Sequence, residues 1–127
     1  MYVVIRWINL LFERIVMNED WISQIKRGTL EYAILILIKK KDRYGYDLIQ
    51  TLEKYPMLQT KESTVYPLLR RLLKNNYLEA YWKNIEEGTP PRKYYKITEL
   101  GNFYLNALKR DWMILVKNIS DLSEEEK

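Results

Sequence analysis

The chain is 127 residues long, which fits one domain that can bury a real core. It contains no cysteine and no histidine. Disulfides, thiolate metal sites and cysteine nucleophiles are therefore excluded, and the commonest general base and metal ligand is missing. We expect neither an enzyme nor a bound cofactor or metal, and a reducing, cytoplasmic compartment suits this composition.

The formal net charge of +4 comes from the middle of the chain. Residues 39–96 carry thirteen basic and seven acidic side chains, whereas residues 1–38 carry four of each and residues 97–127 carry four basic and six acidic ones. A local basic surplus predicts a polyanionic partner such as nucleic acid. A solvated surface with uneven charge is the alternative interpretation of charge alone.

Residues 1–16 are apolar and aromatic, with charges at Arg6, Glu13 and Arg14. These charges interrupt any run of the ~20 apolar residues that a membrane span needs, and no signal-peptide pattern is present. We expect no membrane partner. Two interpretations of this extension stay open: an artefact of a misplaced start codon, or an amphipathic helix that packs on a partner.

Helical spacing of apolar residues predicts a long first helix from Trp21 and a short second helix. The first ends at Lys39–Lys41, because basic side chains suit a helix C-terminus. The second closes before Pro56, and a turn follows to Thr60. The apolar positions are Ile22, Ile25, Leu30, Ala33, Ile34, Leu37 and Ile38 in the first helix, and Leu48, Ile49 and Leu52 in the second.

A third helix follows, and Pro67 restricts where it starts. Proline is tolerated in about the first turn of a helix, so this helix begins near Thr60 to Ser63. Its N-terminal end offers free backbone N–H groups to phosphate, and in helix-turn-helix proteins this end contacts base edges. We expect Val65, Leu68, Leu69 and Leu72 to be buried, and Lys61, Ser63, Thr64 and Tyr66 to lie at that end.

Two strands that contain aromatic residues are predicted next. Tyr77 to Lys83 alternates, which predicts a half-buried strand with one face turned to the core. Turn residues from Glu86 to Pro91 separate it from a second strand, Arg92 to Ile97. We expect Leu78, Ala80, Trp82 and Tyr95 on the core side, and Tyr77, Glu79, Tyr81, Lys83, Tyr94, Arg92 and Lys96 on the other.

A last long helix is predicted, with Thr98 as its N-cap. Its apolar residues are spaced 3 and 4 apart, a near-heptad seam that suits packing against a helix of a second subunit. The alternative is that this chain's own first helix fills the seam. We expect Ser120–Lys127 to be acidic and frayed. The seam consists of Leu105, Leu108, Trp112, Leu115, Ile119 and Leu122.

These elements together are typical of a mainly α (α+β) fold, a winged helix-turn-helix with a two-stranded wing and a long C-terminal helix. The sequence resembles the PadR family of bacterial transcriptional regulators, in its compact subgroup with a single C-terminal dimerisation helix. The resemblance covers about residues 27–105. It is carried by GTLEYAILILI in the first helix, YGYDLI in the second, ESTVYPLLRRLLKNNYL across the third, and RKYYKITELG from the wing into the last helix.

The resemblance implies a homodimer that binds a palindromic operator, with the third helix in a major groove and the wing over the flanking backbone or minor groove. Two of the residues implied to bind DNA have a structural alternative to that role: Arg70 could lie on a solvated helix face, and Tyr44 could pack the turn. Pro90 and Pro91 give the wing a stiffer loop than is usual in the family. The implied DNA-binding residues are Tyr44, Lys61, Ser63, Thr64, Tyr66, Arg70, Arg92 and Lys93.

In the compact subgroup, drug-responsive members stack planar ligands on aromatic residues at the dimer interface. Trp112 lies on the seam where such a residue would fall, and Trp21 could contribute from the first helix. Two copies of Trp112 across a two-fold axis would sandwich a planar aromatic inducer. Ordinary interface packing is the alternative role of Trp112.

We therefore expect a DNA-binding transcriptional regulator, in particular a homodimeric repressor that a small-molecule inducer releases, with a drug-efflux or stress operon as its target. The alternative is a winged-helix adaptor that binds an acidic protein without sequence-specific DNA binding. The expected organisation is an extension over residues 1–16, a winged helix-turn-helix domain over 17–98, a dimerisation helix over 99–122 and an acidic tail over 123–127.

Overall fold

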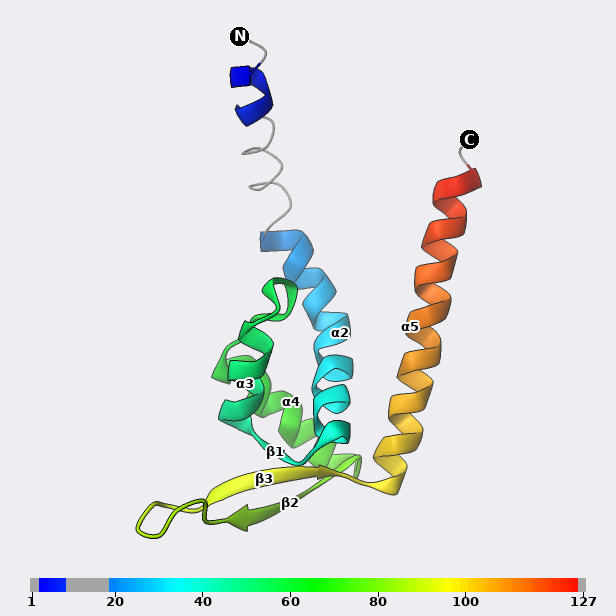
Figure 1. Cartoon of the computed structure of the whole chain (residues 1–127). Coiled ribbons are helices and arrows are strands. Elements are labelled where there is room, and N and C mark those ends of the chain that lie inside the picture. The colour runs from blue at the N-terminus through cyan, green and yellow to red at the C-terminus, as the bar shows by residue number, and fades with distance from the viewer. Residues whose placement is uncertain (1–2, 9–18, 126–127) are drawn as a thin grey trace.

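The computed structural model of the chain describes residues 3–8 and 19–125 (Figure 1). Its winged-helix architecture confirms the predicted fold and adds two short elements, a strand before the second helix and a 3-10 turn before the third. The elements in chain order are α2 (Glu19–Lys40), β1 (Arg43–Tyr44), α3 (Gly45–Glu53), η1 (Pro56–Leu58), α4 (Glu62–Lys74), β2 (Leu78–Lys83), β3 (Arg92–Ile97) and α5 (Glu99–Glu125).

The core lies where α2, α3 and α4 meet and is closed by the base of the sheet. The predicted apolar stripe of α4 is confirmed for Val65, Leu69 and Leu72, which are fully buried, and Leu68 packs against them with part of its surface exposed. Tyr95 of β3 completes the core from the sheet side, as its alternation predicts. The buried residues from the other helices are Leu30, Ile34, Leu35, Ile38, Leu48, Leu52 and Leu105.

Helix α4 begins at Glu62, within the predicted range, and Lys61 precedes it in an extended conformation. Pro67 lies in its second turn, one turn further along than expected. The proline nitrogen cannot donate to the carbonyl of Ser63, four residues earlier. The Ser63 carbonyl therefore lacks the backbone donor four residues later that an α-helix normally supplies.

The sheet has three antiparallel strands in the order β1-β3-β2. The expectation that β2 is half-buried is wrong, since only Leu78 at its start is buried. Ala80 is exposed, and Trp82 is 67% exposed. The β2-β3 hairpin extends past the edge of the helical core (Figure 1), so no element covers its far part. The alternation of β2 places Leu78, Ala80 and Trp82 on one face of the strand, but it does not show that the core covers that face only at Leu78.

Helix α5 starts as predicted, because the Thr98 hydroxyl accepts a hydrogen bond from the Gly101 N–H at 2.9 Å. Gly101 is required there, since a Cβ would meet the backbone carbonyl of Tyr77. The helix continues to Glu125, so the expected fraying from Ser120 is not observed up to that residue.

The seam of α5 divides into two parts. Leu105 is buried, Leu108 packs against the core, and the ring of Trp112 lies 6.5 Å from that of Tyr32 on α2. The alternative that the first helix fills the seam therefore holds for its beginning. Further along, α5 stands apart from the other elements (Figure 1). The exposed seam residues there are Leu115, Ile119 and Leu122.

Residues 3–8 of the N-terminal extension are helical, with exposed side chains. The other residues of that extension lie outside the described part of the chain. Within residues 3–8 and 19–125, no helix is long and apolar enough to cross a membrane.

Candidate nucleic-acid interface

Helix α4 and the wing face each other across a hollow of about 640 Å³, which we call the wing-side hollow. Five of the eight predicted DNA-binding residues line it, from three different elements. Tyr66 and Arg70 project from α4, Arg92 and Lys93 from β3, and Tyr44 from β1. The other lining residues are Gly45, Tyr46, Glu62, Trp82 and Tyr95.

Tyr66 reaches this hollow because α3 begins with a glycine. A Cβ on Gly45 would lie 2.5 Å from Cε1 and 2.6 Å from the hydroxyl of Tyr66. Real atoms do not approach so closely, so a side chain at position 45 would displace the tyrosine ring. The YGY motif thus has a steric role: its glycine lets the ring of Tyr66 lie against the start of α3.

A row of aromatic rings on the sheet contacts two of the wing cations. The Tyr44 and Tyr94 rings meet edge to face at 5.3 Å, and the Tyr94 and Tyr81 rings stack at 5.7 Å. The Arg92 guanidinium lies 4.5 Å from the Tyr44 ring centroid, and Lys83 Nζ lies 5.7 Å from that of Tyr94. Such cation–π contacts orient the charges without neutralising them. The Tyr44 ring therefore contacts the wing through Tyr94 and Arg92.

A hydrogen bond ties the wing to the end of α2. The Tyr81 hydroxyl donates to Oδ2 of Asp42 at 2.6 Å. The Asp42 carboxylate disfavours the tyrosinate and raises the pKa of Tyr81 to about 12. This bond and the aromatic contacts keep the far part of the hairpin in place although no core lies beneath it.

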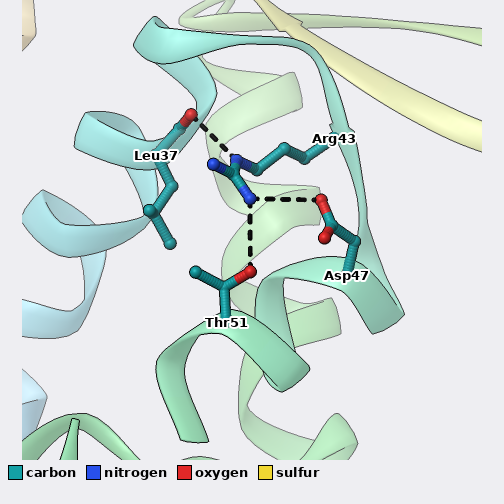
Figure 2. Close-up of polar contacts among 4 residues, drawn as sticks. All are labelled: Leu37, Arg43, Asp47 and Thr51. Carbon is teal, nitrogen blue, oxygen red and sulfur yellow. Dashed lines mark hydrogen bonds and ion pairs between the residues drawn. The ribbon is translucent and has the colours of Figure 1, made fainter. Parts of the chain in front are cut away.

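Arg43 joins α2 to α3 and is the one buried charged residue of the described chain. Figure 2 shows its guanidinium between the two helices. Its Nε donates to the Leu37 carbonyl at 3.0 Å, and one terminal nitrogen contacts Asp47 at 3.3 Å and Thr51 at 3.2 Å. Tyr44 follows Arg43 directly in the chain, so the contacts of Arg43 also fix the position of Tyr44. The guanidinium of Arg92 lies over the Tyr44 ring. The positioning role of Arg43 was not predicted, since a single arginine in a turn carries no periodic signal.

The other three predicted residues, Lys61, Ser63 and Thr64, do not line the wing-side hollow. They lie on the other flank of α4, in a second hollow of about 810 Å³ against α2, which we call the α2-side hollow. The predicted set is therefore split between two flanks of one helix. The other residues that line the α2-side hollow are Ser23, Lys26, Arg27, Leu30, Gln59, Thr60, Pro67, Leu68 and Arg71.

The predicted ligand residues are not brought together within one chain. Trp112 contacts Tyr32 and keeps 40% of its surface exposed, whereas Trp21 is exposed at the start of α2. Trp82, which alternation places in the core, lies instead at the rim of the wing-side hollow. Trp82 therefore lines the same hollow as Arg92 and Lys93, a position that alternation alone could not indicate.

Chemically, the wing-side hollow offers three cations, one carboxylate and several aromatic hydroxyls. Within the described ranges, no three acidic side chains gather where a metal ion could bind. Positive charge and hydrogen-bond donors on a helix and an adjacent hairpin are the features with which winged helices grip a nucleic-acid backbone.

Comparisons with known proteins agree with this geometry. Residues 34–107 match the profile of the "Transcriptional regulator PadR-like family". A relative from Lysinibacillus sphaericus, named "Uncharacterized protein X", is 44% identical over 105 residues, which cover 81% of this chain and 94% of the relative.

Solved structures of similar proteins extend the agreement to three dimensions. A PadR-like transcription factor from Bacteroides fragilis is 36% identical, with a TM-score of 0.67 over 82% of this chain and 99% of the other. A PadR family transcriptional regulator from Eggerthella lenta is 30% identical, with a TM-score of 0.76 over 91% of this chain and 97% of the other. The family's description as regulators agrees with the expectation that the chain is not an enzyme. The chain therefore belongs to the PadR-like family of DNA-binding transcriptional regulators.

Proposed function

We propose that this regulator is a homodimeric repressor that places α4 in the major groove of a palindromic operator and the wing over the flanking backbone. One observation carries the proposal: Tyr66 and Arg70 of α4 line the same hollow as Arg92 and Lys93 of the wing. A helix and a hairpin that present cations to one hollow can grip a groove and its adjacent phosphates together.

The side chains divide into two chemical roles. Ser63, Thr64 and Tyr66 carry hydroxyls that can donate to base edges or phosphates. The cations Lys61, Arg70, Arg92 and Lys93 release counterions from the DNA and supply affinity more than sequence readout. Tyr44 acts through Arg92, whose guanidinium it supports. Positioning by phosphate contacts should outweigh direct reading of bases.

The dimer would form through α5, over residues 99–122 of the proposed organisation. Leu115, Ile119 and Leu122 share one face of the helix and are exposed in the single chain. A row of apolar side chains with this spacing is suited to pack against the same row of a second copy. A two-fold dimer matches the symmetry of a palindromic site.

Release of the operator would follow when a planar aromatic inducer binds between the subunits. Trp112 supports this proposal because it lies at the boundary between the packed and the exposed parts of the seam and remains 40% exposed. Trp21 could join from α2. The regulated genes would lie beside its own gene, with a drug-efflux or stress operon as the target.

Band-shift titration against DNA upstream of its own gene tests the repressor proposal. We expect sequence-specific binding that Tyr66→Ala and Arg70→Ala each weaken while the dimer persists in sedimentation. Equal affinity for scrambled DNA of the same length, over a range of salt, would contradict specific recognition. No DNA binding together with a retained dimer would instead favour the protein-interaction adaptor.

The inducer proposal has a test of its own. Planar aromatic cations and anions are titrated while tryptophan emission and the band shift are followed together. We expect quenched emission and weaker operator binding with at least one compound, and no quenching in Trp112→Leu. Unchanged emission and unchanged binding would remove the inducer from the proposal without affecting DNA recognition.

A further inference from the structure

The α2-side hollow is the more positive of the two flanks of α4. Four cations line it, Lys26, Arg27, Lys61 and Arg71, and no acidic residue is among its described lining residues. The wing-side hollow has three cations and Glu62. Hydroxyl groups of Ser23, Thr60, Ser63 and Thr64 also line the α2-side hollow. Cations with neutral donors and no carboxylate are the composition that favours a phosphate.

Part of this hollow is fixed by contacts within the chain. Lys26 Nζ donates to the Gln59 carbonyl at 2.7 Å, which ties α2 to the segment before α4. Arg71 pairs with Glu31 at 3.1 Å and is partly neutralised. Arg27 forms no ion pair with any residue in the described ranges, and it is exposed. Its guanidinium is therefore available to an external anion.

The position of the hollow relates it to the DNA groove. Ser63, Pro67 and Arg70 lie on the face of α4 opposite the buried Val65 and Leu69. One hollow flanks this face on each side. A major groove is about 12 Å wide and is bordered by two phosphate backbones, so a helix that lies in it has one backbone on either flank.

We propose that the α2-side hollow binds the phosphate backbone on the second border of the groove, with Arg27 and Lys26 as its principal contacts. The wing would hold one strand and the start of α2 the other. This inference rests on the proposed function and extends the DNA-contacting surface to α2, a helix that otherwise serves the core and the packing of α5.

Fluorescence anisotropy with the full chain and an operator duplex tests the proposal over a series of salt concentrations. Arg27→Gln should weaken binding about threefold to tenfold, equally for operator and scrambled DNA, and should lower the salt slope by about one per subunit. The double variant Lys26→Gln with Arg27→Gln should lower it by about two per subunit. Lys109→Gln on α5 removes the same charge far from either hollow and should leave affinity and slope unchanged.

Three binding results would overturn the proposal, and each has a different meaning. Wild-type affinity and slope in Arg27→Gln, with specific binding intact in the parent chain, would show that the hollow faces no phosphate. Absence of DNA binding by the parent chain would overturn the proposed function, and this inference with it. Saturable binding of inorganic pyrophosphate that Arg27→Gln abolishes, with unchanged DNA affinity, would assign the hollow to a small anion.

The double variant also loses the hydrogen bond from Lys26 to the Gln59 carbonyl, so weaker DNA binding could come from lower stability. Thermal melts of both variants separate loss of stability from loss of a phosphate contact. Arg27→Gln breaks no hydrogen bond or ion pair between described residues, so its melting temperature should stay close to that of the parent. A lowered melting temperature in Arg27→Gln that accounts for the lost affinity would count against the proposal.

Discussion

The winged-helix unit and the far half of α5 have similar apolar periodicity but very different surroundings. Leu48 and Leu69 of the winged-helix unit are fully buried by elements of the same chain. Leu115, Ile119 and Leu122 of α5 are 50%, 58% and 64% exposed. An apolar stripe at helical spacing indicates that a face avoids water, but it does not say what covers that face. The difference separates a region whose apolar face is buried within the chain from one whose apolar face no described element covers.

The largest expected effect comes from charging the exposed seam. Leu115→Glu with Ile119→Glu should convert a dimer into a folded monomer, because four carboxylates would have to be desolvated in the interface. Operator affinity should fall by about 10²–10⁴-fold, since each half-site would then be bound independently. Sedimentation, circular dichroism and a band shift measure the three consequences.

A matched control places the same charges on α5 away from the seam. Asn106→Glu with Ser120→Glu should leave both assembly and operator affinity near those of the parent chain. A dimer that survives the seam substitutions would show that the two regions do not differ in the way the exposure indicates.

The second prediction compares one substitution in both regions. Leu69→Ala should lower the free energy of unfolding by about 2–5 kcal/mol, because the side chain is fully buried and leaves a cavity. Leu122→Ala should cost less than about 0.5 kcal/mol in dilute protein, where the chain is monomeric. Denaturant unfolding at two protein concentrations checks both values. If Leu122→Ala lowered the free energy of unfolding strongly at both protein concentrations, Leu122 would have to be packed within the single chain, contrary to its exposure.

Much of the winged-helix unit could be predicted because its signals are local. Pro67 and the residues before it restrict the start of α4, and Thr98 marks the start of α5 with a cap that the structure confirms. The prediction for β2 was wrong because it depended on how far the core extends along the strand. Trp82 alternates in phase with Leu78, yet the core ends between them, and no sequence period reports where neighbouring elements stop.

The candidate site was predicted as one set of residues but lies on two flanks of α4. Sequence position placed Lys61, Ser63 and Thr64 with Tyr66, because all of them precede or begin the same helix. A helix turns by a full revolution in 3.6 residues, so neighbours in sequence face different directions. Arg27 was missed for a different reason, because it lies on another helix and only the fold brings it to the same hollow as Lys61.

The third prediction concerns the contact between α2 and α3. Arg43→Gln should lower the free energy of unfolding by about 1–3 kcal/mol, because the Leu37 carbonyl and the Asp47 carboxylate lose a charged donor in a largely buried place. Urea unfolding measures this loss. Arg110→Gln, whose partner Asp111 is exposed on α5, should change stability little. Equal effects would remove the distinction between the packed and the exposed region.

A smaller, more local effect is expected at the start of α3. Gly45→Ala should weaken operator binding about tenfold while stability changes by less than about 1 kcal/mol, because the end of the Tyr66 side chain can swing away from the new methyl group. Gly28→Ala on α2 is the control, since a Cβ there meets no atom within 4 Å. Operator anisotropy and urea unfolding separate the two effects. Unchanged affinity in Gly45→Ala would show that the position of Tyr66 does not matter for DNA.

The smallest effect is expected where the wing is tied to the end of α2. Because the folded pKa of Tyr81 is raised from 10.0 to about 12, its hydrogen bond to Asp42 contributes stability below pH 10 that is lost as pH rises to 12. Tyr81→Phe should therefore be slightly less stable than the parent at neutral pH, and the difference should disappear in that alkaline range. Burial also raises the pKa of Tyr95 and Tyr104, but both variants share these groups, so their contributions cancel. Unfolding of the two proteins at a series of pH values gives the difference directly, and a difference that stays constant up to pH 12 would show that Asp42 does not hold the wing.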